Sequence, residues 1–181
     1  MTDSNGKALN ADQLKPDAEV RKKVRFNLTE AKRLTPKVTN PGEIDDVVFQ
    51  LGINDFNDGL RENEIVQKLF DVQVQYKKLF PNARQHVTAI PPLSKEHEQV
   101  NKGLQKLCNN HECNFISAKS FMDHASGKFR ANLMRRDNLH YNDIGIRHLA
   151  KGIKKSLYSS SNLQSTQLSR IANLRGDIPS Q

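Results

Sequence analysis

The amino-acid sequence predicts an α/β protein built on a parallel sheet. Short apolar segments alternate with longer segments of helical periodicity, and two of the apolar segments end in Gly or Pro. This strand–helix–strand alternation is typical of parallel sheets whose crossover connections are right-handed. A length of 181 residues suits one domain and is short for two. We therefore expect a single α/β domain with helices packed on its sheet.

Four segments are expected to form strands, because each is short, apolar and bounded by turn-forming residues. The run at 45–52 is continuously apolar and ends in Gly52, which indicates a strand buried on both faces. The run at 84–92 ends in two prolines, which cannot continue a hydrogen-bonded ladder. In chain order, the expected strands are 18–26, 45–52, 84–92 and 113–119.

Helices are expected where apolar residues recur three and four positions apart. The pattern is clearest between 60 and 80, where apolar residues from Ile65 to Leu79 share one face. The mixed segment 120–136 is expected to combine a helix with a loop. The other expected helices are 27–38, 94–110 and 142–157.

The composition changes after Tyr158, where the chain becomes polar and rich in serine. Such a segment has too little apolar surface to pack against a core, so it is expected to be disordered or weakly helical. We therefore expect residues 1–158 to form the domain and residues 159–181 to form a C-terminal tail. No internal repeat is visible in the sequence.

The chain is basic, with a formal net charge of +8, and the positive residues concentrate in 128–156. A surface of this kind could bind an acidic partner such as nucleic acid. No RNA- or DNA-binding motif accompanies it, so a solvated basic face is the preferred interpretation. The alternative is a binding module that uses this face for an acidic partner.

No apolar run reaches the length of about 18 residues that a membrane helix needs, and residues 1–10 lack the apolar segment of a secretory signal. A soluble, cytoplasmic protein is therefore expected. Cys108 and Cys113 do not make a disulfide framework, and they suit a reducing compartment. His111 lies between them, but a closed zinc site needs about four ligands. We expect a helix-to-strand turn here and no metal.

Four polar residues in three blocks lie where a parallel sheet gathers its active residues, at the carboxyl ends of strands. Asn54 follows the strand 45–52 and could donate its amide to a developing oxyanion, or could simply form a turn. Ser4 is flanked by turn-forming residues and could present its hydroxyl or cap a helix. Asp137 and His140 precede the last helix, as a cap or as a general base with its orienting carboxylate.

Taken together, these blocks resemble the SGNH (GDSL-type) hydrolases in residue type, order and context. The resemblance runs from residue 2 to about 157 and includes Ile90-Pro91-Pro92 and the closing helix "NDIGIRHLAKGI". The residues that carry it are Asp3-Ser4, Gly52-x-Asn54-Asp55 and Asp137-x-x-His140. It implies a three-layer α/β/α sandwich with a flavodoxin-like parallel sheet. It also implies hydrolysis of carboxylic esters, with a small-molecule, glycan or lipid ester as substrate.

The resemblance further implies a role for each matching residue. Ser4 would be the nucleophile and, through its N–H, the first oxyanion donor. Asn54 would donate its side-chain amide to the same oxyanion. His140 would take the Ser4 proton and pass it to the leaving alcohol, while Asp137 fixes the imidazole. Gly52 and Asp55 would lie beside the substrate, and neither a metal nor an organic cofactor is required.

Three departures from the family pattern stand out. Thr2 replaces the glycine of the first block, and Asn27 occupies the place of the glycine that supplies a second backbone donor. The strand that leads into the serine block is expected to be missing or truncated, because the chain begins one residue before Thr2. We therefore expect this chain to be a fragment of a longer protein. Supply of the lost strand by a partner chain is an alternative.

A nucleotide-binding domain of similar sheet order is a third class of function. It is disfavoured, because no Gly-rich phosphate loop follows any expected strand. The order of the three blocks favours a serine esterase over the non-catalytic binding module.

Overall fold

The computed structural model describes residues 1–10, 14, 19–33, 41–137 and 139–175, with side chains described as far as residue 159. Three parallel strands, β1 (Asp46–Phe49), β2 (Arg84–Thr88) and β3 (Cys113–Ile116), form a sheet in the order β1-β2-β3. The expected strands at 45–52, 84–92 and 113–119 are thus confirmed, although each is shorter than predicted.

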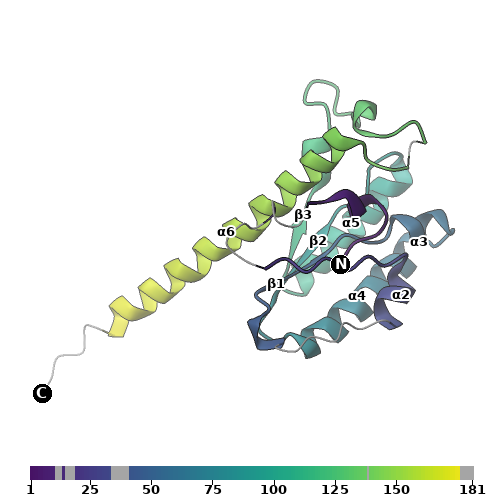
Figure 1. Ribbon diagram of the computed structural model, residues 1–181. Helices are drawn as coiled ribbons and strands as arrows, with labels where there is room; N and C mark the ends of the chain where they lie inside the picture. The colour runs from purple at the N-terminus through teal and green to yellow at the C-terminus, as the bar shows by residue number, and fades with distance from the viewer. Residues whose placement is uncertain (11–13, 15–18, 34–40, 138, 176–181) are drawn as a thin grey trace, which may run out of the picture.

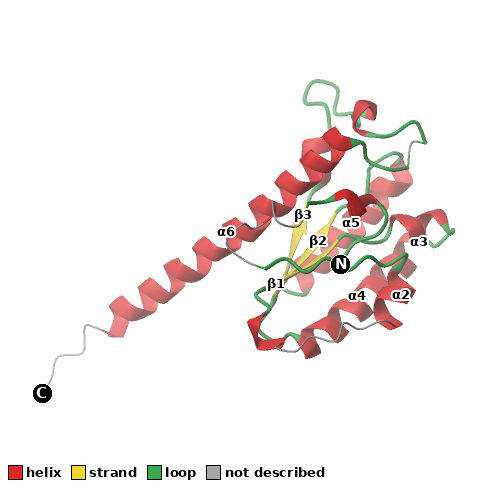
Figure 2. Cartoon of the chain, in the orientation of Figure 1, coloured by secondary structure: helices red, strands yellow, loops and turns green. Residues whose placement is uncertain are grey.

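The sheet is the middle of three layers (Figures 1 and 2). One core cluster joins β1 and β2 to the helices α2 (Leu28–Arg33), α4 (Glu62–Leu79) and α5 (Lys95–Asn110). A second cluster joins Ile116 of β3 to Leu149, Ile153 and Leu157 of α6 (Asp143–Arg175). The α/β/α sandwich is therefore confirmed. The remaining short elements are α3 (Ile53–Asn57), η1 (Asn5–Ala8), η2 (Pro41–Glu43), η3 (Ala118–Phe121) and η4 (Ala131–Leu133).

Residues 1–3 take the place of the first strand, whose absence or truncation was expected. Thr2 forms parallel bridges with Val24 on one side and with Gln50, just after β1, on the other. The Thr2 N–H donates to Lys23 O at 3.0 Å, and the Asp3 N–H donates to Gln50 O at 2.9 Å. A side chain at Gly6 would overlap Thr2 Oγ1, so only glycine lets the chain fold back this closely over Thr2. Residues 1–3 thus run as a short extended segment beside the end of β1.

The prediction of a strand at 18–26 was wrong over its described part. Only Val24 makes a bridge there, because its partner segment is three residues long and cannot extend the ladder. Val24 and Phe26 are accordingly exposed, at 41% and 60%. The predicted helix within 120–136 was also wrong. This segment contains the short turns η3 and η4, and antiparallel bridges join Met122 to Phe129 and Met134 to Tyr141.

Helix α6 continues to Arg175, beyond the expected end at 157. No Gly or Pro interrupts the sequence between Gly152 and Gly176, so no strong breaker ends the helix earlier. The division of the chain at residue 158 stays a prediction. In the part of the chain that is described, no helix is both long and apolar enough to cross a membrane.

The cysteine prediction was wrong, because Cys108 and Cys113 form a disulfide rather than two free thiols. Their Cα atoms are 4.5 Å apart, within the range that a disulfide requires. The turn between α5 and β3 brings them together, and Glu112 in this turn has a φ of 52°. The expected helix-to-strand turn is therefore present.

Candidate active site

The candidate catalytic residues gather at the carboxyl edge of the sheet. Ser4 follows the short segment 1–3, and Asn54 follows β1 in the first turn of α3. His140 lies on the loop that precedes α6. Three segments that are distant in sequence therefore meet at the edge where parallel sheets place their active groups.

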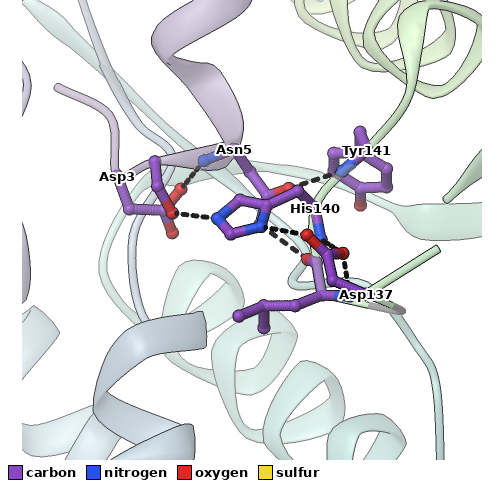
Figure 3. A network of polar contacts seen from close by, with 7 residues as sticks. Asp3, Asn5, Asp137, His140 and Tyr141 are labelled. Carbon is purple, nitrogen blue, oxygen red and sulfur yellow. Dashed lines mark hydrogen bonds and ion pairs between the residues drawn. The ribbon is translucent and has the colours of Figure 1, made fainter. Parts of the chain in front are cut away.

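A hydrogen-bonded relay joins Ser4, His140 and Asp137. Ser4 Oγ lies 3.1 Å from His140 Nε2, and His140 Nδ1 lies 2.9 Å from Asp137 Oδ2. The imidazole therefore stands between the serine segment and the carboxylate, as Figure 3 shows. These distances are within the reach that a general base and its orienting group need. The side chain of His140 is 30% exposed, so solvent and small molecules can reach it.

Asp137 organises the loop as well as the imidazole. Its Oδ1 accepts hydrogen bonds from the backbone N–H groups of Leu139 and His140, both at 2.9 Å. These two N–H groups, and then the His140 side chain, hold the pKa of the Asp137 carboxyl far below its usual range. An ionised carboxylate at this position favours the imidazole tautomer with its proton on Nδ1, which would leave Nε2 as the acceptor toward Ser4 Oγ.

The capping role that Asp137 might have had belongs to another residue. Asn142 Oδ1 accepts from the N–H groups of Ile144 and Gly145, at 3.0 and 3.1 Å, at the start of α6. The Asn142 amide also donates to Asn132 O and Met134 O, which ties the loop to the segment before it. Asp137 is therefore not needed as the cap of α6.

Asn5 was missed by the sequence reasoning and clamps the two halves of the site together. Its Nδ2 donates to Leu139 O at 3.2 Å, and its Oδ1 accepts from Tyr141 N–H at 2.8 Å. Asn5 thus holds both neighbours of His140, while its own backbone follows directly after Ser4 (Figure 3). It is 2% exposed. Its one sequence signal, an Asn-Gly pair, also indicates an ordinary turn.

Asp3 is a buried carboxyl beneath this clamp. It is fully buried, its Oδ1 accepts from Asn5 N–H at 2.8 Å, and burial raises its pKa to about 6. Because the folded protein binds this proton more tightly than the unfolded chain, the carboxyl contributes stability below pH 4. That contribution is lost as the pH rises through about 6.

We therefore expect Asp3→Asn to stabilise the protein at pH 8 and to leave it nearly unchanged at pH 4. The expected gain in the free energy of unfolding at pH 8 is on the order of 2 kcal/mol, because Asn cannot ionise and keeps the oxygen that accepts from Asn5. Urea denaturation at pH 4, 6 and 8 measures it. The exposed Asp58→Asn is the control, and equal pH dependence in wild type and Asp3→Asn would contradict the assignment.

Two of the candidate oxyanion donors, Asn54 and Asn27, lie near one another. Asn54 is buried, and its Nδ2 donates to Phe26 O at 2.6 Å, which places its amide against the Phe26–Asn27 peptide. The Asn27 side chain instead caps α2, because its Oδ1 accepts from Glu30 N–H at 2.9 Å. Within the described ranges, the backbone N–H groups of Ser4 and Asn27 have no acceptor. These two donors are free to serve a ligand.

Gly52 and Asp55 support the Asn54 turn. Gly52 has a φ of 111°, a conformation that favours glycine, and opens α3. Asp55 is 2% exposed, and both of its oxygens accept from Leu28 N–H, at 3.3 and 3.0 Å. Burial raises the pKa of its carboxyl. These contacts fit support of the loop better than the direct substrate contact that was expected of both residues.

A second Ser–His–Asp arrangement lies at the opposite, amino end of the sheet. His86 Nδ1 is 2.8 Å from Ser156 Oγ, and His86 Nε2 is 3.0 Å from Asp46 Oδ1. Arg84 also holds Asp46 through two hydrogen bonds of 2.8 Å. The His86 side chain is completely buried, so this cluster ties α6 to the sheet. Ser156 therefore provides an internal comparison for Ser4.

No group of three or more potential metal-ligating side chains occurs among the residues with described positions. The polar groups that meet at the carboxyl edge are a hydroxyl, an imidazole, a carboxylate and amides. This set suits acyl transfer through a serine nucleophile.

Solved structures with the same fold include several esterases. A Streptococcus pneumonia protein, whose description refers to platelet activating factor, superposes with a TM-score of 0.72 at 17% identity, covering 87% of this chain and 81% of that one. An acetyl esterase mutant has a TM-score of 0.59 at 20% identity, with coverages of 80% and 76%. A lipolytic G-D-S-L family protein from Veillonella parvula has a TM-score of 0.54 at 14% identity, with coverages of 83% and 92%.

These similarities show that the chain has the SGNH (GDSL-type) hydrolase fold, as the sequence resemblance implied. No protein-family model and no curated protein matches the sequence.

Proposed function

We propose that this protein is a serine hydrolase of carboxylic esters. The observation that carries the proposal is the relay of Ser4 Oγ, His140 and Asp137, with distances of 3.1 and 2.9 Å. Esterases among the proteins of the same fold support ester hydrolysis in general terms. The free N–H groups beside Ser4 and Asn54 add the donors that an acyl transfer needs.

In the proposed reaction, His140 Nε2 takes the proton of Ser4 Oγ as that oxygen attacks the ester carbonyl. The negative charge that forms on the carbonyl oxygen is stabilised by the Ser4 N–H, the Asn54 amide and the Asn27 N–H. His140 then protonates the leaving alcohol, which gives a Ser4 acyl-enzyme. A water molecule, deprotonated by His140, then attacks the acyl carbonyl. The bond between Ser4 Oγ and the acyl carbon breaks, His140 returns the proton to Ser4, and the acid is released. Asp137 stays ionised throughout and stabilises the imidazolium.

Turnover of p-nitrophenyl acetate tests the proposal. We expect hydrolysis above the buffer rate, with an initial burst of p-nitrophenol when release of the acyl group is slower than its formation. A folded chain with no hydrolysis above background would contradict the proposal. Salt-sensitive binding to nucleic acid by such a chain would favour the alternative of a non-catalytic module that uses the basic face 128–156.

The variant Asn54→Ala is expected to lower kcat by about 10²- to 10³-fold, because it removes one oxyanion donor. KM should change little, since the missing hydrogen bond forms mainly in the transition state. Steady-state kinetics on the same aryl ester measure both constants. Asn57→Ala is the matched control, because Asn57 is exposed on the same short helix. Equal activity in both variants would remove Asn54 from the proposed oxyanion hole.

A further inference from the structure

A pocket of about 500 Å³ opens between the loop after β2 and the segment 127–134. Its apolar lining includes Leu93, Phe129 and Met134. Among the described residues, its charged lining consists of Lys95, Lys128 and Glu98. Apolar walls with a few charged groups are typical of sites for small organic ligands.

The pocket lies next to the candidate active site. Met134 forms an antiparallel bridge with Tyr141, and Arg135 N–H donates to His140 O at 2.7 Å. The pocket wall is therefore hydrogen-bonded to the loop that carries His140. Leu93 and its neighbours follow β2, at the same sheet edge as Ser4 and Asn54. An ester bound at Ser4 could extend one of its ends into this pocket.

The segment that forms one wall is strongly cationic. Residues 124–136 contain Lys128, Arg130, Arg135 and Arg136 and no carboxylate. The two flanking carboxylates are occupied: Asp123 Oδ1 accepts from Ser126, and Asp137 holds the His140 loop.

None of these four cations forms an ion pair with any other described residue, and neither does Lys95. Lys95 interacts electrostatically with the neighbouring Glu96 carboxylate and shares the pocket with Glu98, whereas no carboxylate lies within ion-pairing distance of the four cations of 124–136 in the described structure.

Building on the proposed function, we propose that the pocket binds an anionic group of the ester substrate: a carboxylate, phosphate or sulfate. Lys95 and Lys128 would attract the anion, while Phe129 and Met134 would contact the apolar atoms between it and the ester. The charge could belong to the alcohol portion or to the acyl portion of the ester. In either case the same anionic group would occupy the pocket. The test therefore includes one ester with its charge on the alcohol portion and one with its charge on the acyl portion.

The kinetic test compares charged esters with neutral isosteres. 4-Acetoxybenzoate carries its charge on the alcohol side and is paired with 4-acetoxybenzamide. Mono-4-nitrophenyl glutarate carries its charge on the acyl side and is paired with its carbamoyl analogue. In the pair whose charge lies on the portion that enters the pocket, we expect kcat/KM for the anionic ester to exceed kcat/KM for its neutral partner. We expect this preference for the anionic ester to fall as the salt concentration rises.

Lys128→Gln should lower that preference by about three- to fivefold, the range expected for one partly exposed charge contact. Lys106→Gln is the matched control, since it removes the same charge from an exposed position near the other end of α5. It should leave the preference unchanged.

A binding experiment gives a second readout that does not require activity. The chain has three methionines, and only Met134 lines the pocket, so methyl-¹³C methionine NMR reports on the pocket, with Met1 and Met122 as internal references. In the Ser4→Ala variant, 4-acetoxybenzoate should shift the Met134 methyl signal in a saturable way. 4-Acetoxybenzamide should shift it less, and Lys128→Gln should weaken the response to the anion.

The outcomes separate the two proposals. Ser4-dependent hydrolysis with no charge preference and no Met134 shift would overturn the anion pocket and leave the esterase proposal standing. A saturable Met134 shift without hydrolysis of any ester would overturn the esterase proposal and support the anion pocket.

Discussion

Replacing Ser4 by alanine should abolish ester hydrolysis, with a loss in kcat of about 10⁴- to 10⁶-fold. The reason is that no other hydroxyl in the described part of the site contacts His140. The residual rate should reflect only the oxyanion donors and substrate binding. Single-turnover kinetics with p-nitrophenyl acetate measure the loss, because they separate formation of the acyl-enzyme from its hydrolysis.

The matched control for this variant is Ser156→Ala. Ser156 also contacts a histidine that is bonded to an aspartate, but His86 is completely buried at the amino end of the sheet. We expect this variant to keep full activity and to lose some stability, because a contact between α6 and the sheet is removed. Activity that survives in Ser4→Ala and disappears in Ser156→Ala would contradict the assignment of the nucleophile to Ser4 and would assign it to Ser156 at the amino end of the sheet.

Asp137→Asn should lower kcat by about 10⁴-fold, the loss known for the equivalent change in a serine protease triad. The amide of Asn would donate to His140 Nδ1, so the imidazole would carry its proton on Nε2 and could not accept the proton of Ser4. The oxygen that accepts from Leu139 and His140 N–H is retained in Asn, so the loop should keep its shape.

Asp123→Asn is the control for this second variant. Asp123 organises a similar turn, through Ser126, and has no contact with His140 in the described structure. Its activity should equal that of the wild type. An active Asp137→Asn variant would contradict the assigned role.

Much of the fold could be predicted, because the three paired strands and their helices leave clear apolar patterns. The central runs at 45–52, 84–92 and 113–119 coincide with β1, β2 and β3. The strand at 18–26 failed because its pairing depends on only three residues elsewhere in the chain. The segment 120–136 failed because it forms isolated bridges and short turns, which leave no periodic signal in the sequence.

The types and the chain order of the candidate catalytic residues could be predicted. The residues that hold them in position, such as Asn5, could not. Ser4 and His140 are 136 positions apart, and only their fit to a three-block pattern linked them. Asn5 could not be found, because its role depends on contacts with Leu139 and Tyr141 that exist only in the folded chain. The disulfide was missed for a similar reason: the turn at Glu112, rather than cysteine spacing, brings the sulfurs together.

The most direct test of the central claim is labelling of the folded chain with a fluorophosphonate, followed by peptide mass mapping. Such probes react with serines that a neighbouring base activates. We predict a label on Ser4 that is absent in His140→Ala, and none on Ser156, whose histidine is buried. A folded chain with no label on Ser4, or with labelling that persists in His140→Ala, would contradict the account of Ser4 as a nucleophile activated by His140.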